Sequence, residues 1–230
     1  MPGLMAEQRR YVALLLMAGA MWGSSFAVIK IGLDTVDPLY FALLRFALGG
    51  ALMAIAVLAM GRFDVHVLWS RPIIVLSAVN ALAFALQNIG LTMTTATNAA
   101  LLININIGVV AILAAVMLKE TITRRTLYGL AIGLAGVLFV STGGDLAAVL
   151  DGSRIGDLLV FGAGVLWAFY IVYMKRTLHR ESDVLMVSTA VIIGSAAFLV
   201  PLTALFAHSL ALPASGLWTV LYLGVVCTGI

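Results

Sequence analysis

Charged residues are scarce in this chain of 230 residues. Aspartate, glutamate, lysine and arginine together make up 10% of it, whereas hydrophobic residues make up 63%. The mean hydropathy is +1.15. A chain of this composition cannot cover a water-facing surface with polar side chains, which excludes a soluble globular domain. We therefore predict an integral membrane protein.

Cysteine and histidine are also rare. The single cysteine, Cys227, cannot form an intrachain disulfide, and the three histidines all lie in predicted connections. The chain contains no P-loop, no H-E-x-x-H motif and no G-x-S-x-G motif. We therefore predict that the protein is not an enzyme and holds no cofactor or metal. Any transport would be secondary rather than driven by ATP.

Apolar runs recur along the whole chain, and each is long enough to cross about 30 Å of hydrocarbon as a helix. Eight membrane-spanning helices are predicted, at residues 11–33, 38–60, 71–91, 95–118, 124–142, 155–174, 183–206 and 214–230. Capping residues precede several of them, including Asp37 before Pro38 and Ser182 or Asp183 before the seventh run. The connections are short, so we predict an all-α fold without a soluble insert.

Lysine and arginine are distributed unevenly among the connections. If the N-terminus is cytoplasmic, ten of the 13 basic residues lie in inside connections and only Arg154 lies outside. Cytoplasmic connections of membrane proteins carry such an excess. The other two, Lys30 and Arg45, lie within predicted helices. We predict a cytoplasmic N-terminus and, because the basic residues are scattered, no nucleic-acid partner.

An internal repeat appears when the sequence is displaced by 145 residues. "MWGSSFAVIK" then falls on "LWAFYIVYMK", so that Trp22 meets Trp167 and Lys30 meets Lys175. Many transporters are built from such duplications. Five helices are an odd number, so the second copy must enter the membrane from the other side. We predict two inverted five-helix repeats, at 1–143 and 155–230, with the second incomplete at its C-terminus and ten helices in the complete fold.

Three further segments make the sequence similar to a known family. The five-helix plan, together with "RFALGGALMAIAVL", "NIGLTMTTATNAALL" and "LKETIT", resembles the EamA family of the drug/metabolite transporter superfamily. The resemblance implies ten helices, a multi-pass location in the bacterial inner (plasma) membrane and movement of small metabolites by alternating access. Proline often interrupts the fourth helix of that family, whereas this chain has Gly108 there. We therefore expect a mild bend at most.

The run at 71–91 carries the clearest polar face. Its members fall within about a third of the helix circumference: Ser77, Asn80, Phe84, Gln87 and Asn88. Unsatisfied amides are costly in hydrocarbon, so this face must contact protein or a cavity. It either lines a cavity or forms hydrogen bonds between helices. We take Asn80, Phe84, Gln87 and Asn88 as candidate substrate-binding residues.

Aromatic and small polar residues mark two other runs. Trp22 and Ser25 share one face of the run at 11–33, and Trp167 and Tyr170 share a face of its repeat counterpart. Rings with a polar handle suit a site for small amphipathic solutes. These four residues are further candidates for substrate binding, and tryptophans that simply pack are the alternative.

Two more candidates lie in the runs at 38–60 and 95–118. Arg45 requires a partner within the membrane, either an anionic group of a substrate or asparagine and backbone carbonyls. Asn104 and Asn106 project about 200° apart, given 100° per residue. We assign Asn104 to the pathway and Asn106 to packing. Lys30 is either an interface anchor or a pathway cation.

No acidic residue lies deep within an apolar run, and Glu120 is expected to pair with Arg124 or Arg125. Exporters of lipophilic cations usually need an embedded carboxylate. We therefore predict neutral, zwitterionic or anionic solutes. Gly129, Gly133 and Gly136 are expected to pack against another helix of the chain rather than form a dimer seam.

These observations predict a secondary transporter of small metabolites such as amino acids. Its partners are a small-molecule substrate and the lipid bilayer, and it acts as a monomer or a homodimer. The alternative is a membrane receptor or assembly subunit without transport activity. A transporter predicts a wet cavity near the midplane, whereas the alternative predicts polar faces that pack shut.

Overall fold

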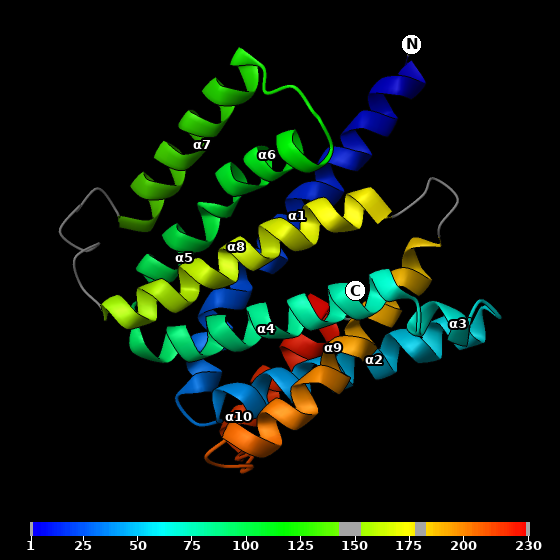
Figure 1. The fold of residues 1–230 in the computed structure, drawn as a ribbon, viewed down its shortest axis with the longest axis vertical. Helices are drawn as coiled ribbons and strands as arrows, with labels where there is room; N and C mark the ends of the chain where they lie inside the picture. The colour runs from blue at the N-terminus through cyan, green and yellow to red at the C-terminus, as the bar shows by residue number, and fades with distance from the viewer. Residues whose placement is uncertain (1, 143–152, 178–182, 229–230) are drawn as a thin grey trace.

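The computed structural model describes residues 2–142, 153–177 and 183–228, and the regular secondary structure in these ranges is helical (Figure 1). The elements are α1 (Pro2–Leu33), α2 (Pro38–Ala59), α3 (Val65–Leu68), α4 (Arg71–Met93), α5 (Ala96–Asn104), α6 (Asn106–Met117), α7 (Arg124–Thr142), α8 (Arg154–Thr177), α9 (Val184–Phe206), α10 (Ala214–Tyr222) and the π-helical segment η2 (Leu223–Thr228). Each predicted span contains a helix, so the all-α prediction is confirmed.

Six stretches of the described helices are long and apolar enough to cross a membrane. They are Leu16–Leu33, Pro38–Ala59, Arg71–Met93, Ala96–Met117, Arg154–Thr177 and Val184–Phe206. The two other predicted spans correspond to α7 and to the shorter apolar stretch formed by α10 and η2. The chain is a multi-pass membrane protein.

Local sequence signals determine where the helices begin and end. The Asp37 carboxylate accepts hydrogen bonds from the first backbone N–H groups of α2, and Asp183 does the same for α9. These bonds satisfy donors that have no partner within the helix. At the other end of α2, Gly61 adopts a φ of 66°, a left-handed conformation that glycine adopts without strain.

The fourth predicted span is irregular at one residue, Ile105, whose dihedral angles stay helical at φ −59° and ψ −23°, and Ala96–Met117 remains a single apolar stretch. The helix ends at Asn104, turns at Ile105 and resumes as α6 at Asn106. The Asn104 side-chain amide donates to the Ala100 carbonyl, 2.7 Å away, four residues back. Such a bond competes with the backbone ladder of the helix. The irregularity therefore coincides with an asparagine and lies before Gly108.

Helices α2, α4, α8 and α9 form the packed centre of the bundle. Helix α4 lies between α8 and α9, and α9 also packs on α2 (Figure 1). The crossing of α4 and α8 is close, because a Cβ on Gly90 would lie 2.8 Å from the Gly156 carbonyl oxygen. A Cβ on Gly156 would lie 3.0 Å from the Gly90 carbonyl oxygen. Only glycine permits this approach of the two backbones.

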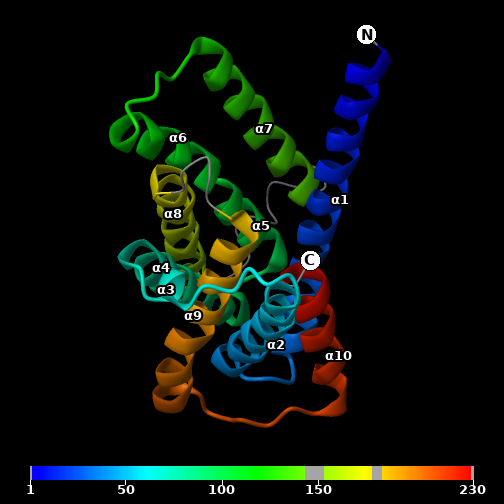
Figure 2. The same ribbon diagram turned by 90° about the vertical axis from the view of Figure 1, so that its right-hand side faces the viewer.

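Helix α7 lies at the edge of the bundle and packs mainly on α5 (Figure 2). Its glycines do not make the intramolecular contact that we expected. A Cβ added at Gly129, Gly133 or Gly136 would meet no described atom within 4 Å beyond the adjoining residues and backbone of α7 itself. The prediction of close helix packing at these positions is therefore wrong for the described residues.

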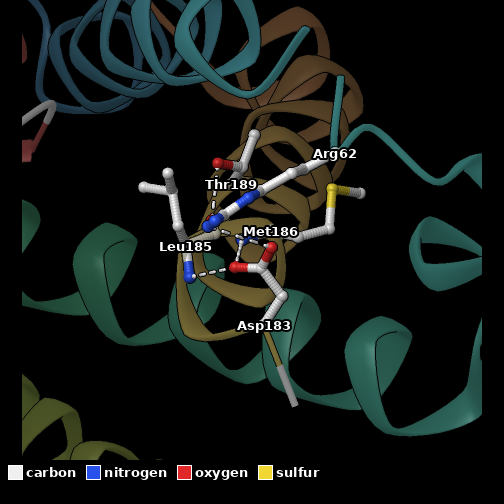
Figure 3. Close-up of polar contacts among 5 residues, drawn as sticks. All are labelled: Arg62, Asp183, Leu185, Met186 and Thr189. Atoms are coloured by element: carbon white, nitrogen blue, oxygen red, sulfur yellow. Dashed lines mark hydrogen bonds and ion pairs between the residues drawn. The ribbon is translucent and has the colours of Figure 1, made fainter. Parts of the chain in front are cut away.

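The connections lie at two ends of the bundle. We call the end that carries Arg62, Arg71 and Lys119 the basic end, and the other the opposite end. Two exposed ion pairs lie at the basic end: Arg62 with Asp183 at 3.8 Å (Figure 3), and Lys175 with Glu120 at 2.7 Å. Glu120 was expected to pair with Arg124 or Arg125. It pairs with Lys175 because α8 ends beside the α6–α7 connection.

Helices that the predicted repeat would pair run in opposite directions. The C-terminal part of α1 and the start of α8 lie at the same end, since Lys30 donates to the Thr94 carbonyl and Thr94 donates to Asp157. Helix α2 begins at the opposite end, where the Asp37 carboxylate accepts a hydrogen bond from the His208 N–H. Helix α9 begins at the basic end.

Candidate functional site

A cavity of about 220 Å³ lies near mid-length of the packed helices, and we call it the central pocket. Five elements contribute to its wall: α2, α4, α8, α9 and η2. The lining residues are Arg45, Phe46, Asn80, Phe84, Trp167, Tyr170, Ile171, Ile192, Cys227 and Thr228. The structure therefore brings five of the candidate residues together: Arg45, Asn80, Phe84, Trp167 and Tyr170.

Three aromatic rings contact one another in sequence along one wall. The Phe84 ring centroid lies 4.7 Å from that of Phe46 and 5.0 Å from that of Trp167, both with edge-to-face geometry. Such arrangements place the positive edge of one ring against the negative face of the next. All three side chains are buried. The wall is therefore continuous and apolar, with Phe84 at its centre.

Arg45 is the charged residue of the pocket and is only 4% exposed. Its Nε donates to the Thr228 hydroxyl, 2.7 Å away in η2. The guanidinium carbon lies 4.9 Å from the Phe84 ring centroid, within the range of a cation–π interaction. No carboxylate among the described residues pairs with it. A positive charge therefore lies at the pocket without a counter-anion from the part of the chain that the structure describes.

Asn80 both lines the pocket and ties two helices together. Its amide nitrogen donates to the Ser195 hydroxyl on α9, 3.0 Å away. The Ser195 hydroxyl and Ser77 continue this polar seam between α4 and α9. Both alternatives for the polar face of α4, cavity lining and interhelical hydrogen bonding, are thus combined in one residue.

The other candidates on α4 do not line the central pocket. Asn88 is buried and donates to the Pro38 carbonyl at 3.0 Å, which ties α4 to the start of α2. Gln87 is buried, and its Oε1 has no hydrogen-bond partner among the described residues. These two side chains lie toward the opposite end from Phe84.

Three candidates on other helices are not among the residues seen to line the central pocket: two lie elsewhere, and the side chain of the third is not described. Ser25 is buried on α1, and Asn104 is half-buried and bonded to its own helix. Asn106, which we assigned to packing, is buried. Trp22 lies in α1, but its side chain is outside the described part of the structure.

Several lining residues were not predicted. Phe46 and Ile192 lack any polar mark, and Cys227 was not among the candidate residues. Thr228 is one of many threonines in apolar runs. Nothing in the sequence distinguishes these residues. Their position at the pocket depends on how distant helices cross, and in particular on how η2 crosses α2. There, a Cβ on Gly49 would lie 3.0 Å from the Gly224 carbonyl oxygen.

A second polar cluster, at the opposite end, was also missed. The Lys30 amine donates to the carbonyls of Leu91, at 2.6 Å, and Thr94, at 3.2 Å. The Asp157 carboxylate accepts hydrogen bonds from the Thr94 hydroxyl and the Asn98 amide. We call these residues the opposite-end cluster. Lys30 therefore binds the carbonyls at the C-terminal end of α4, where a cation is favoured.

A larger cavity of about 390 Å³ opens at the basic end, between α3, α4, α8 and α9. Its lining includes Asp64, His66, Ser70, Thr177 and Asp183 together with apolar residues such as Leu76. Leu76 lies one turn from Asn80 on α4, so the two cavities occupy neighbouring positions along this helix.

Comparisons with family models and with known proteins point to the same family of transporters. The model of the EamA-like transporter family matches residues 9–142 and 154–230. An uncharacterized transporter of Archaeoglobus fulgidus is 31% identical, over 94% of this chain and 75% of its own length. The uncharacterized inner membrane transporter YedA of Escherichia coli is 29% identical, over 73% of this chain and 56% of its own.

Another Escherichia coli protein, a probable amino-acid metabolite efflux pump, is 29% identical over 90% of this chain and 66% of its own length. The chain thus spans between about half and three quarters of these relatives. A solved structure with 22% identity covers 94% of the chain with a TM-score of 0.72, which supports the fold.

Proposed function

The chain belongs to the EamA-like transporter family, and from this we propose that it is a secondary transporter of small metabolites, such as amino acids, that works by alternating access. The observation that carries the proposal is the central pocket, because it lies near mid-length of helices from both halves of the chain. Substrate sites of transporters built from inverted repeats occupy this position.

We propose that the substrate contacts the five candidates that line the pocket. The aromatic wall of Phe84 and Trp167 would hold an apolar part of the solute, and Arg45, Asn80 and Tyr170 would supply polar contacts. Trp22, Ser25, Gln87, Asn88 and Asn104 stay predictions for the pathway on either side of this pocket.

The inverted repeat is part of the proposal, and reciprocal contacts between α2 and α9 support it. Asp37, the N-cap of α2, bonds to His208 just after α9, whereas Asp183, the N-cap of α9, pairs with Arg62 just after α2. Asp183 lies 146 residues after Asp37, and His208 lies 146 residues after Arg62, one residue more than the displacement that aligns Trp22 with Trp167. A twofold relation between two copies running in opposite directions accounts for both contacts.

We also propose that the basic end faces the cytoplasm of a bacterial cell, with the N-terminus on that side. The excess of lysine and arginine at this end supports this orientation. The name of the YedA relative, an inner membrane transporter, supports the location.

Transport of labelled amino acids into proteoliposomes tests the proposal. We expect Trp167→Ala to lower the rate at least about tenfold, since it removes an aromatic wall of the pocket. Trp218→Ala is the matched control, because this tryptophan is 47% exposed on α10 and does not line the pocket. Equal rates for the two variants would refute the site. Failure of the wild type to move any solute of a broad metabolite panel would favour the receptor or assembly role.

A further inference from the structure

We infer that the central pocket recognises a carboxylate group through Arg45, so that its ligands are small organic acids or zwitterionic amino acids with an apolar side chain. This inference rests on the proposed function and narrows its substrate class. It follows from three features of the pocket: a charge without a counter-anion, hydrogen-bond donors left over, and an apolar wall beside them.

The first feature is the uncompensated charge. Arg45 is the eighth residue of α2, within a membrane-spanning stretch, and is 4% exposed. A buried guanidinium is costly unless an anion or several acceptors surround it. Both ion pairs among the described residues lie at the basic end and leave Arg45 out. An anionic ligand would supply the missing charge.

The second feature is the geometry of the donors. Nε of Arg45 is engaged by Thr228 at 2.7 Å, and this bond fixes the plane of the guanidinium. Neither terminal nitrogen has an acceptor among the described residues. A guanidinium offers its donors as a planar fork that matches the two oxygens of a carboxylate. A ligand in the pocket therefore meets donors that are already oriented.

The third feature is the surface beside the charge. Phe84 lies 4.9 Å from the guanidinium carbon and 5.0 Å from the Trp167 ring, so the charged and aromatic parts are contiguous. With a cavity of about 220 Å³, the pocket suits a small molecule that has a carboxylate at one end and an apolar group at the other.

Lys30, the other basic residue within a predicted span, provides a contrast inside the same protein. Its amine donates to two backbone carbonyls, and it does not line the central pocket. The structure accounts for Lys30 as an anchor between α1 and α4. Within residues 2–142, 153–177 and 183–228, Arg45 has no carbonyl acceptor of this kind, and it lies at the pocket, so the inference concerns Arg45 and not Lys30.

The test compares acids with their amides. Binding of L-phenylalanine, N-acetyl-L-phenylalanine and the corresponding amides to the purified full-length protein would be measured by calorimetry, with uptake into proteoliposomes in parallel. We expect the wild type to prefer each acid over its amide by roughly tenfold to a hundredfold, as for a charge-assisted pair. Arg45→Gln should abolish this preference, whereas Arg45→Lys should retain part of it. Lys30→Gln, the matched control, should keep the ratio of the wild type.

The ratio of acid to amide separates recognition from a structural role. If Arg45 only held η2 in place, Arg45→Gln would weaken the binding of acids and of amides by the same factor. That result would overturn the inference. Tight binding of amides by the wild type, or no binding of any of these probes, would also overturn it. If the same vesicles then took up an uncharged solute, the proposed transport function would stand, and only the recognition of a carboxylate would be refuted.

Discussion

Helices α4 and α7 have a similar apolar character but very different surroundings. Both are apolar and rich in small residues, and both were predicted to span the membrane. In an apolar 18-residue stretch of α4, 61% of the residues are buried, and the helix packs between α8 and α9. In α7, large apolar side chains such as Tyr128 and Ile132 are 69% and 73% exposed. Hydropathy therefore identifies a span but does not show which face, if any, other helices cover.

The difference between the two helices lies in their polar residues. Helix α4 carries Ser77, Asn80, Gln87 and Asn88, which hydrocarbon cannot satisfy, and all four are buried. The described part of α7 has no comparable amide face. Van der Waals packing and hydrogen bonds drive helix association in lipid, because lipid tails are as apolar as the side chains. A polar face is thus the better sign of a central helix.

The largest expected effect on folding stability is at the crossing of α4 and α8. Gly156→Leu would place a side chain against the backbone of Gly90 and Met93, which cannot move aside. We expect a loss of about 3 kcal/mol or more of folding stability, at the upper end of overpacking effects. Thermal unfolding in detergent would measure it. Gly133→Leu in α7 is the matched control and should be nearly neutral; a similar loss there would remove the distinction between the helices.

A smaller effect is expected at the opposite-end cluster, where α4 meets α1, α5 and α8. Asp157→Ala removes a carboxylate that accepts hydrogen bonds from the Thr94 hydroxyl and the Asn98 amide, so these two buried groups lose that acceptor. The cost should be about 1 to 3 kcal/mol.

The comparison for that variant is Glu120→Ala at the basic end. Its ion pair with Lys175 joins side chains that are 46% and 63% exposed. An exposed pair contributes at most about 1 kcal/mol. The two variants would be compared by chemical denaturation under one detergent condition, and a costlier Glu120→Ala would reverse our ranking of the two ends.

Next in size is the seam between α4 and α9. Ser195→Ala should cost about 0.6 to 2 kcal/mol, the range for hydrogen bonds between membrane helices. Asn80→Leu should cost as much and also slow transport, because Asn80 lines the central pocket and Ser195 does not. Stability and uptake measured on both variants would separate the two roles of Asn80. Equal uptake by both variants would assign Asn80 to packing alone.

The smallest effect is expected in α7. Phe139 is 71% exposed, so Phe139→Ala removes few contacts within the chain. We expect a change within about 0.5 kcal/mol, as for a surface substitution. A loss above about 2 kcal/mol in the thermal melt would mean that another helix or a second subunit covers this face in the folded protein.

Much of the fold could be predicted from the sequence. The caps at Asp37 and Asp183 depend on neighbouring residues. The lengths of the spans, and the alternation of the connections between the two ends of the bundle, depend on the thickness of the bilayer. The site was predictable in part, because amides, tryptophans and an arginine within apolar runs are conspicuous. Five of these side chains line one pocket, whereas Gln87, Asn88 and Asn104 do not.

The sequence by itself determined that the chain is a multi-pass helical membrane protein, since an apolar helix satisfies its own backbone in lipid. Only the tertiary structure decided that Arg45 meets Phe84 and Thr228, that Glu120 pairs with Lys175, and that no other described segment packs against the glycines of α7. Each of these depends on which helices cross and at what height. Crossings follow from packing between distant segments, and local composition does not encode them.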